Sequence, residues 1–166
     1  MEFTEIWKFL LPRFATFFTA MTPIGELRAS IPIALLTYGM NIAETYIISV
    51  IGNLVPVVAI LWILEPVSKF LMNRFRLFNR FFNWLFDHTR RKHSQRFQRY
   101  TGFALIGFVA IPLPVTGGIT GAIIAFVFGI PPRKAFLHIF YGILIAGIIV
   151  TVISKTIGYV KFITAV

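Results

Sequence analysis

The sequence has no cysteine and little charge. Without cysteine, the 166 residues cannot form disulfides, thiolate nucleophiles, iron–sulfur clusters or cysteine-based zinc sites. Charged residues make up only 13% of the chain, and six of them are acidic, whereas a soluble domain carries about 25% charged residues. A chain this poor in charge lacks the polar surface that a water-soluble fold requires.

Apolar residues are present in excess. They account for 57% of the chain, and the mean hydropathy is +0.81, whereas soluble domains are about 45–50% apolar. The length permits about four to six membrane segments joined by short loops. We therefore predict an all-α, polytopic integral membrane protein, with residues 1–166 forming a single domain in the lipid bilayer.

The first apolar segment, residues 6–38, is interrupted near its centre. Pro23, Gly25, Glu26 and Arg28 leave no uninterrupted apolar span of about 20 residues. Backbone that breaks at membrane depth is tolerated only where protein or a water-filled cavity satisfies it. We predict a re-entrant or short-helix hairpin with a polar turn.

A long apolar helix follows this hairpin. Gly39-Met40-Asn41 is a helix stop, and residues 43–64 form an apolar stretch closed by Glu65-Pro66. The strongly polar residue inside this stretch is Asn53, which follows Gly52. Hydrogen bonding between closely packed helices is the default role for such a residue.

Residues 68–87 alternate aromatic side chains with basic and amide ones. At about 100° per residue the apolar side chains share one side, which predicts an amphipathic helix in the membrane interface. A basic, water-exposed connection continues it over 89–99. The whole linker, 66–100, contains nine of the sixteen lysines and arginines. The positive-inside rule explains this clustering better than a nucleic-acid footprint does, so we expect no nucleic-acid partner.

The second half repeats the order of the first. An apolar segment over 103–129 is broken at 111–121, and after a turn a last apolar run covers 135–160. A shift of 90 residues places Glu26 opposite Thr116. Internal similarity of this kind indicates repeated units. The predicted units are repeat 1 over 6–65, the linker over 66–100 and repeat 2 over 101–160.

The order of elements also predicts the orientation of the two repeats. A hairpin begins and ends on one side of the membrane and the next helix crosses it, so the second repeat starts from the opposite face. The repeats are therefore predicted to be inverted, an architecture that builds a site near the midplane from broken helices. The linker and the Arg133-Lys134 turn share one face and hold eleven of the sixteen basic residues. We predict that this face is cytoplasmic and that both termini lie outside a cell membrane.

Glu26 and Arg28 are charged residues at the break in the first apolar segment, and they are the strongest candidates for a function. A charge within the membrane costs roughly 2.5–3.5 kcal/mol on insertion scales and therefore needs a reason. In the functional interpretation, Glu26 exchanges a proton or binds a cation while Arg28 meets an anionic group. In the structural interpretation the two form an ion pair that holds the turn, with Arg13 of the other hairpin arm as a further member.

The second break offers bare backbone rather than charge. Prolines leave carbonyls unpaired and glycines allow close approach, so free N–H groups at a helix start can face an anion or the partner hairpin. Tight packing of small residues is the alternative. The candidate substrate- or ion-binding residues are Glu26, Arg28, Pro112, Pro114, Thr116, Gly117 and Thr120, with Arg13 and Asn53 as secondary candidates.

No catalytic motif accompanies these residues. The sequence has no P-loop, no Ser/His/Asp set and no carboxylate cluster of the protease or phosphatase kind. We therefore predict a protein that is not an enzyme and that needs no cofactor or metal. Any transport would be passive or driven by an ion gradient.

Two stretches carry a resemblance to a known family. GELRASIPIA over 25–34 and IPLPVTGGITGA over 111–122, together with Gly39 and Gly52-Asn53, resemble the small multidrug export protein family over residues 20–150. The resemblance implies a small prokaryotic inner-membrane exporter without an assigned substrate. The layout of two re-entrant hairpins, each followed by a crossing helix, is also similar to the DedA family, which is linked to moving lipid carriers such as undecaprenyl phosphate.

Three functional hypotheses remain open on the sequence. The first is a secondary transporter of small molecules in which Glu26 couples ion or proton movement to export. The second is a translocase of an anionic lipid or polyprenyl-phosphate carrier, and the third is a membrane scaffold without transport. A second copy would close a cavity that so few helices leave open, so a homodimer is a further option.

Overall fold

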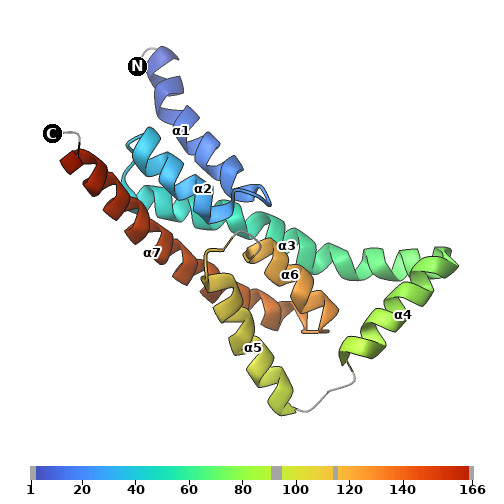
Figure 1. Cartoon of the computed structure of the whole chain (residues 1–166). Coiled ribbons are helices and arrows are strands. Elements are labelled where there is room, and N and C mark those ends of the chain that lie inside the picture. The colour runs from blue at the N-terminus through green and yellow to red at the C-terminus, as the bar shows by residue number, and fades with distance from the viewer. Residues whose placement is uncertain (1–2, 91–94, 114–115, 165–166) are drawn as a thin grey trace.

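A computed structural model of the chain describes residues 3–90, 95–113 and 116–164, and within these ranges the secondary structure is helical. The described residues form seven α-helices and one π-helical turn, and Figure 1 shows how the helices are arranged. The all-α prediction is confirmed. The elements are α1 (Phe3–Met21), α2 (Glu26–Pro32) with the π-turn η1 (Ile33–Thr37), α3 (Ile42–Arg74), α4 (Arg76–Arg90), α5 (Gln95–Ala110), α6 (Gly118–Val127) and α7 (Pro132–Thr164).

Helices α3 and α7 are the longest elements, with 33 residues each. At 1.5 Å per residue such a helix extends about 50 Å, which exceeds the ~30 Å hydrocarbon core of a bilayer. The most apolar stretch of each has a mean hydropathy of 2.5. By length and composition, these two helices can cross a membrane.

Both long helices begin after a glycine with a left-handed backbone. Gly39 has φ +62° and Gly129 has φ +69°, a conformation that glycine adopts without a steric penalty. Asn41 then caps α3, because its side-chain oxygen accepts a hydrogen bond from the backbone N–H of Ala43 at 2.9 Å. The helix stop predicted at residues 39–41 is confirmed.

The predicted end of the first long helix is wrong. Helix α3 passes through Glu65-Pro66 and ends at Arg74, and Phe75 is extended with φ −130° and ψ 122°. A proline inside a helix removes a single backbone hydrogen bond. Across this turn the Ser68 hydroxyl donates to the Glu65 carbonyl at 2.9 Å, and Lys69 pairs with the Glu65 carboxylate at 2.7 Å. These contacts hold the turn that the proline weakens.

This continuation divides the predicted amphipathic helix. Of residues 68–87, the first part completes α3 and the rest belongs to α4. The connection predicted over 89–99 is also shorter than expected, because α4 reaches Arg90 and α5 begins at Gln95. Residues 91–94 lie outside the described part of the chain. Phe82 of α4 contacts Phe126 of α6, with ring centroids 6.4 Å apart.

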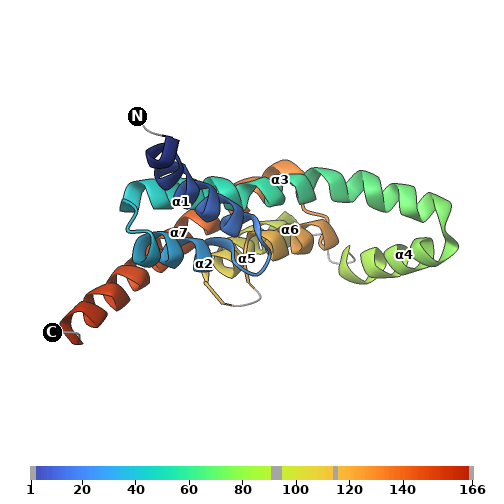
Figure 2. The ribbon, with the colours of Figure 1, turned by 90° about the horizontal axis from the view of Figure 1, so that it is seen from above.

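The connections α1–α2 and α5–α6 lie near the centre of the molecule. In Figures 1 and 2, the turn over 22–25 and the start of α6 are near the middle of α3 and α7, whereas the start of α1 and the end of α7 are at the same end of the molecule. Helix α2 packs against α3 and α7, and α6 packs against the same two helices. Residues that break the two apolar segments are thereby brought to the centre.

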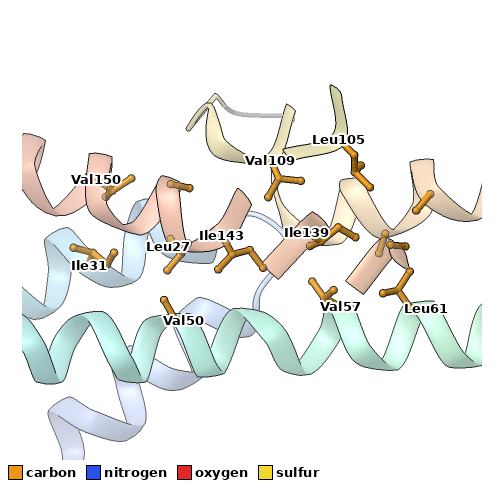
Figure 3. Packing of buried hydrophobic residues seen from close by; sticks show 14 residues of the cluster. Leu27, Ile31, Val50, Val57, Leu61, Leu105, Val109, Ile139, Ile143 and Val150 are labelled. Atoms are coloured by element: carbon orange, nitrogen blue, oxygen red, sulfur yellow. The ribbon is translucent and has the colours of Figure 1, made fainter. Parts of the chain in front are cut away.

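The buried apolar core lies where the short helices α2, α5 and α6 pack against the two long helices α3 and α7, as Figure 3 shows. Large apolar side chains such as Trp62 and Ile63 on α3 and Val152 on α7 are nevertheless exposed. An apolar solvent around the helices accounts for this exposure. The core residues labelled in the figure are Leu27, Ile31, Val50, Val57, Leu61, Leu105, Val109, Ile139, Ile143 and Val150.

Two glycines set corresponding contacts in the two halves. A Cβ added to Gly52 of α3 would lie 2.6 Å from the Phe17 carbonyl oxygen of α1, and a Cβ added to Gly142 of α7 would lie 2.7 Å from the Cβ of Val109 of α5. The close packing predicted at Gly52 is therefore present. Each long helix approaches the first helix of its own half through a glycine.

Gly52→Ala is expected to lower the free energy of unfolding by about 1–3 kcal/mol, the usual cost of overpacking. The added methyl group would face a backbone carbonyl that cannot rotate away. Thermal unfolding in detergent measures the change, with Gly107→Ala as a control because a Cβ there meets nothing within 4 Å. Equal stability of the two variants would show that α1 and α3 pack less closely than described.

Candidate functional site

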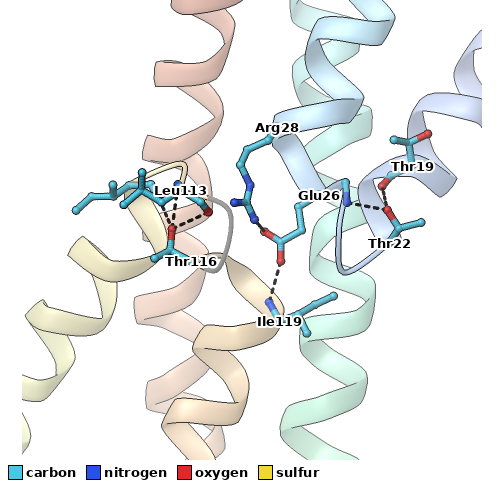
Figure 4. A network of polar contacts seen from close by, with 9 residues as sticks. Thr19, Thr22, Glu26, Arg28, Leu113, Thr116 and Ile119 are labelled. Carbon is cyan, nitrogen blue, oxygen red and sulfur yellow. Dashed lines mark hydrogen bonds and ion pairs between the residues drawn. The ribbon is translucent and has the colours of Figure 1, made fainter.

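The N-terminal end of α6 is capped by a carboxylate from the other half of the chain. Glu26, the first residue of α2, accepts a hydrogen bond from the backbone N–H of Ile119, 93 positions away, with an N···O distance of 3.3 Å. Figure 4 shows this contact. The N-cap residue of α6, Gly117, makes no side-chain capping hydrogen bond. Because the first N–H groups of a helix lack partners and carry partial positive charge, a carboxylate is favourable there.

Glu26 is a buried charge on an unusual backbone. Its exposed fraction is 4%, and Arg28 approaches its second carboxylate oxygen at 3.5 Å. The backbone of Glu26 has φ +43°, a left-handed value that is uncommon for residues other than glycine. The preceding turn is held by the Thr22 hydroxyl, which accepts from the Gly25 N–H at 3.0 Å. Strained backbone and buried charge together are typical of functional positions.

Two glycines at the start of α6 make room for side chains from other elements. A Cβ on Gly117 would collide with the Glu26 carboxylate, and a Cβ on Gly118 would lie 2.6 Å from the side-chain oxygen of Asn53. Gly118 and Ile119 are not among the candidate residues selected from the sequence, although a free N–H group at the start of this helix was expected to face an anion or the partner hairpin, and the N–H of Ile119 faces Glu26. The double glycine before an apolar run is the signal that could have indicated both.

The two breaks and the middles of α3 and α7 enclose a small cavity. Its volume is about 10 Å³, close to the minimum that a single water requires. A cavity of this size has room for nothing larger than one water. The residues that line it are Glu26, Leu27, Arg28, Asn53, Val109, Pro112, Thr116, Gly117, Gly118, Ile143, Ala146 and Val150.

Most of the candidate residues from the sequence meet at this cavity. Thr116 lines it, but its hydroxyl donates to the Ile111 carbonyl at 2.5 Å and accepts from the Leu113 N–H at 3.0 Å, so it holds its own loop. Thr120, further along α6, is not among the lining residues. Pro114 lies outside the described residues.

Arg13 does not join the cavity. Its Nε lies 2.5 Å from a carboxylate oxygen of Glu44, so the ion pair links α1 to the first turn of α3. The structural interpretation that added Arg13 to the Glu26–Arg28 pair is therefore corrected. Glu44 lies early in α3, where it meets Arg13 of the neighbouring helix, and the sequence alone did not show which carboxylate was nearer.

Comparison with known proteins gives one family. A family model described as "Putative small multi-drug export protein" matches residues 26–149. The matched range begins at Glu26, within the first break, and includes the linker and the second break. No curated protein and no solved structure matches the chain.

Proposed function

The chain belongs to the small multi-drug export protein family, and from this premise we propose that it is a membrane exporter whose transport is coupled to protonation of Glu26. One observation carries the proposal, namely that the buried Glu26 carboxylate joins the two halves of the chain at the N-terminus of α6. A charge in that position acts on both halves when it is gained or lost.

The proposed membrane arrangement is a pair of inverted repeats in a prokaryotic inner membrane. Helices α3 and α7 cross the bilayer, and the hairpins α1–α2 and α5–α6 are re-entrant. The bounds of the two long helices support this arrangement. Helix α3 covers 42–74 and α7 covers 132–164, so the shift of 90 residues that relates the two repeats also relates the start and the end of these helices. The basic linker 66–100 and the Arg133-Lys134 turn then face the cytoplasm, and both termini lie outside.

Protonation of Glu26 weakens the link between the halves. Hydrogen bonds to an ionised group are roughly twice as strong as neutral ones. Neutral Glu26 therefore loses its charge attraction to Arg28 and about half of the strength of its hydrogen bond to the Ile119 N–H. The ends of α2 and α6 can then separate and enlarge the cavity, while a cationic substrate and a proton compete for the same carboxylate. Such competition gives the exchange of substrate for protons that export against a gradient requires.

Reconstitution into liposomes tests this function. With an acidic interior and a neutral exterior, we expect the wild-type protein to take up a fluorescent lipophilic cation such as ethidium while protons leave, as reported by an internal pH-sensitive dye. Protein-free liposomes are the control. Absence of both fluxes would support a scaffold without transport, and ethidium uptake without proton release would contradict coupling.

Arg28 gives specific support to a second candidate, the translocase of an anionic lipid headgroup. The arginine is partly exposed, its side chain at 20%, and it lies with the positive end of α6 at the cavity. In this case, wild-type proteoliposomes move a headgroup-labelled phosphatidylglycerol between leaflets, and Arg28→Ala stops that movement. Ethidium exchange with no lipid movement would reject the second candidate.

A further inference from the structure

Four buried polar side chains among the described residues make no hydrogen bond to another protein group. Ser30 of α2 and Thr45, Ser49 and Asn53 of α3 are each at most 1% exposed, yet their side-chain oxygens, and the amide nitrogen of Asn53, have no partner. Burying such groups unpaired destabilises a fold, and most buried polar groups in native proteins are paired. Their retention therefore needs an explanation.

The three groups on α3 form one line along the helix. Thr45, Ser49 and Asn53 are spaced four residues apart, so they lie on one face at about 6 Å intervals. Asn53 reaches the cavity that Glu26 also lines. The line thus runs from the first turn of α3 to the carboxylate of Glu26.

Ser30 lies beside this line. Helices α2 and α3 pack against each other and run in opposite directions, because the short connection over 38–41 joins the end of η1 to the start of α3. Glu26 of α2 and Asn53 of α3 both line the cavity. Ser30 follows Glu26 by four residues, and Ser49 precedes Asn53 by four residues, so both serines are one helical turn away from the cavity in the same direction. The two hydroxyls therefore lie at the same level.

We propose that Thr45, Ser49, Ser30 and Asn53 form a hydrated proton path between Glu26 and the water at the end of α3 where the helix begins. The path rests on the proposed function of Glu26. Successive side chains about 5–6 Å apart at their Cβ atoms can be bridged by one water. Each hydroxyl and each bridging water accepts one proton and passes on another, whereas the amide of Asn53 holds the last water beside Glu26 and does not itself carry the proton. A proton leaves external water, Glu26 gains one, and the hydroxyls end unchanged.

The charged residues at the two ends of the path agree with proton movement from the start of α3 toward Glu26. Among the residues that line the cavity, Arg28 is the charged group that faces Glu26, whereas α3, α6 and α7 contribute uncharged residues there. At the other end Glu44, which precedes Thr45, is paired with Arg13 and its side chain is 33% exposed. Charge is therefore present where the path begins, and in the proposed orientation this end of α3 faces external water.

Helix α7 has no such line in its described residues. The hydroxyl of Ser154 donates to the Val150 carbonyl at 2.7 Å, and that of Thr151 donates to the Gly147 carbonyl at 2.7 Å. These groups are already paired with their own helix. The path consequently gives Glu26 access to protons from one face, the face at which the protein is proposed to have its termini.

The Ser49→Ala and Thr45→Val variants test the path in ethidium proteoliposomes. We expect proton movement to slow about tenfold in each, as expected if one hydrogen-bonded step is lost. The melting temperature should change little, because the hydroxyl that is removed bonds to water in the path and no protein group loses its partner. Ser49→Thr retains a hydroxyl and should restore the rate. A residue with a purely structural role would change the melting temperature and leave the proton rate alone.

Ser154→Ala is the matched control, since it removes a buried serine whose hydroxyl is already paired. It should leave proton movement unchanged. If Ser49→Ala and Thr45→Val move protons at the wild-type rate while Glu26→Gln does not move them, the path is wrong and the proposed function stands. If the wild-type protein moves no protons, the proposed function fails first.

Discussion

Replacing Glu26 by glutamine is expected to uncouple transport from the proton gradient without unfolding the protein. Glutamine has nearly the same shape, and its side-chain oxygen can still accept from the Ile119 N–H. It cannot ionise or exchange a proton at neutral pH. When the binding of two ligands to a protein is coupled, here a proton and ethidium, each typically changes the affinity for the other about 5–150-fold. The apparent affinity for ethidium should vary with pH on this scale in the wild type and be nearly constant in Glu26→Gln.

Glu44→Gln provides the control for this experiment. Glu44 is also a carboxylate paired with an arginine, but its partner is Arg13 and it does not line the cavity. Its variant should therefore retain the pH dependence of ethidium affinity. If Glu26→Gln kept a normal pH dependence, the coupling role of Glu26 would be ruled out, and the carboxylate would be a structural cap of α6.

Gly117→Ala is expected to cause the largest loss at the contact between the halves. An alanine Cβ would occupy the space of the Glu26 carboxylate, so the carboxylate must leave α6 or α6 must move. Hydrogen bonds to charged groups contribute about 1.5–3 kcal/mol, and we expect a loss of that size in the free energy of unfolding. Unfolding in detergent, followed by the helical circular dichroism signal, measures it.

A double-mutant cycle separates this collision from other effects of the alanine. In a Glu26→Ala background no carboxylate remains to be displaced, so Gly117→Ala should cost much less than in the wild type, a non-additivity expected for residues in contact. Gly107→Ala in α5 is the matched control. Its Cβ meets nothing within 4 Å, so it should stabilise the helix by about 0.5–1 kcal/mol. Equal costs for Gly117→Ala in both backgrounds would contradict the contact.

Gly25 helps to set the position of Glu26, because it lies in the tight turn directly before it. A Cβ at Gly25 would lie 2.6 Å from the Thr22 hydroxyl and 2.8 Å from the Thr19 carbonyl oxygen. The turn therefore accepts only glycine at that point without a shift. Because Glu26 follows directly, the same turn that reverses the chain also sets the direction of the carboxylate.

Much of the architecture could be predicted from the sequence, because it depends on neighbouring residues. Apolar runs long enough to span a bilayer indicated the two long helices, and Gly39 before Asn41 indicated where α3 begins. Glycine and proline placed the breaks in the two apolar segments, since both act on the backbone of their immediate neighbours. The end of α3 was missed because contacts around Glu65 hold the helix through Pro66.

By itself the sequence determined that this is a helical chain suited to a membrane, with two polar interruptions and charge in the first. Tertiary structure alone decided that Glu26 caps α6, that Arg13 pairs with Glu44, and that the hydroxyls of Thr45 and Ser49 on α3 are buried without a protein partner. These features depend on residues up to 93 positions apart. Propensity and periodicity describe local backbone and one helix face, whereas the partner of a buried charge is set by how the helices pack.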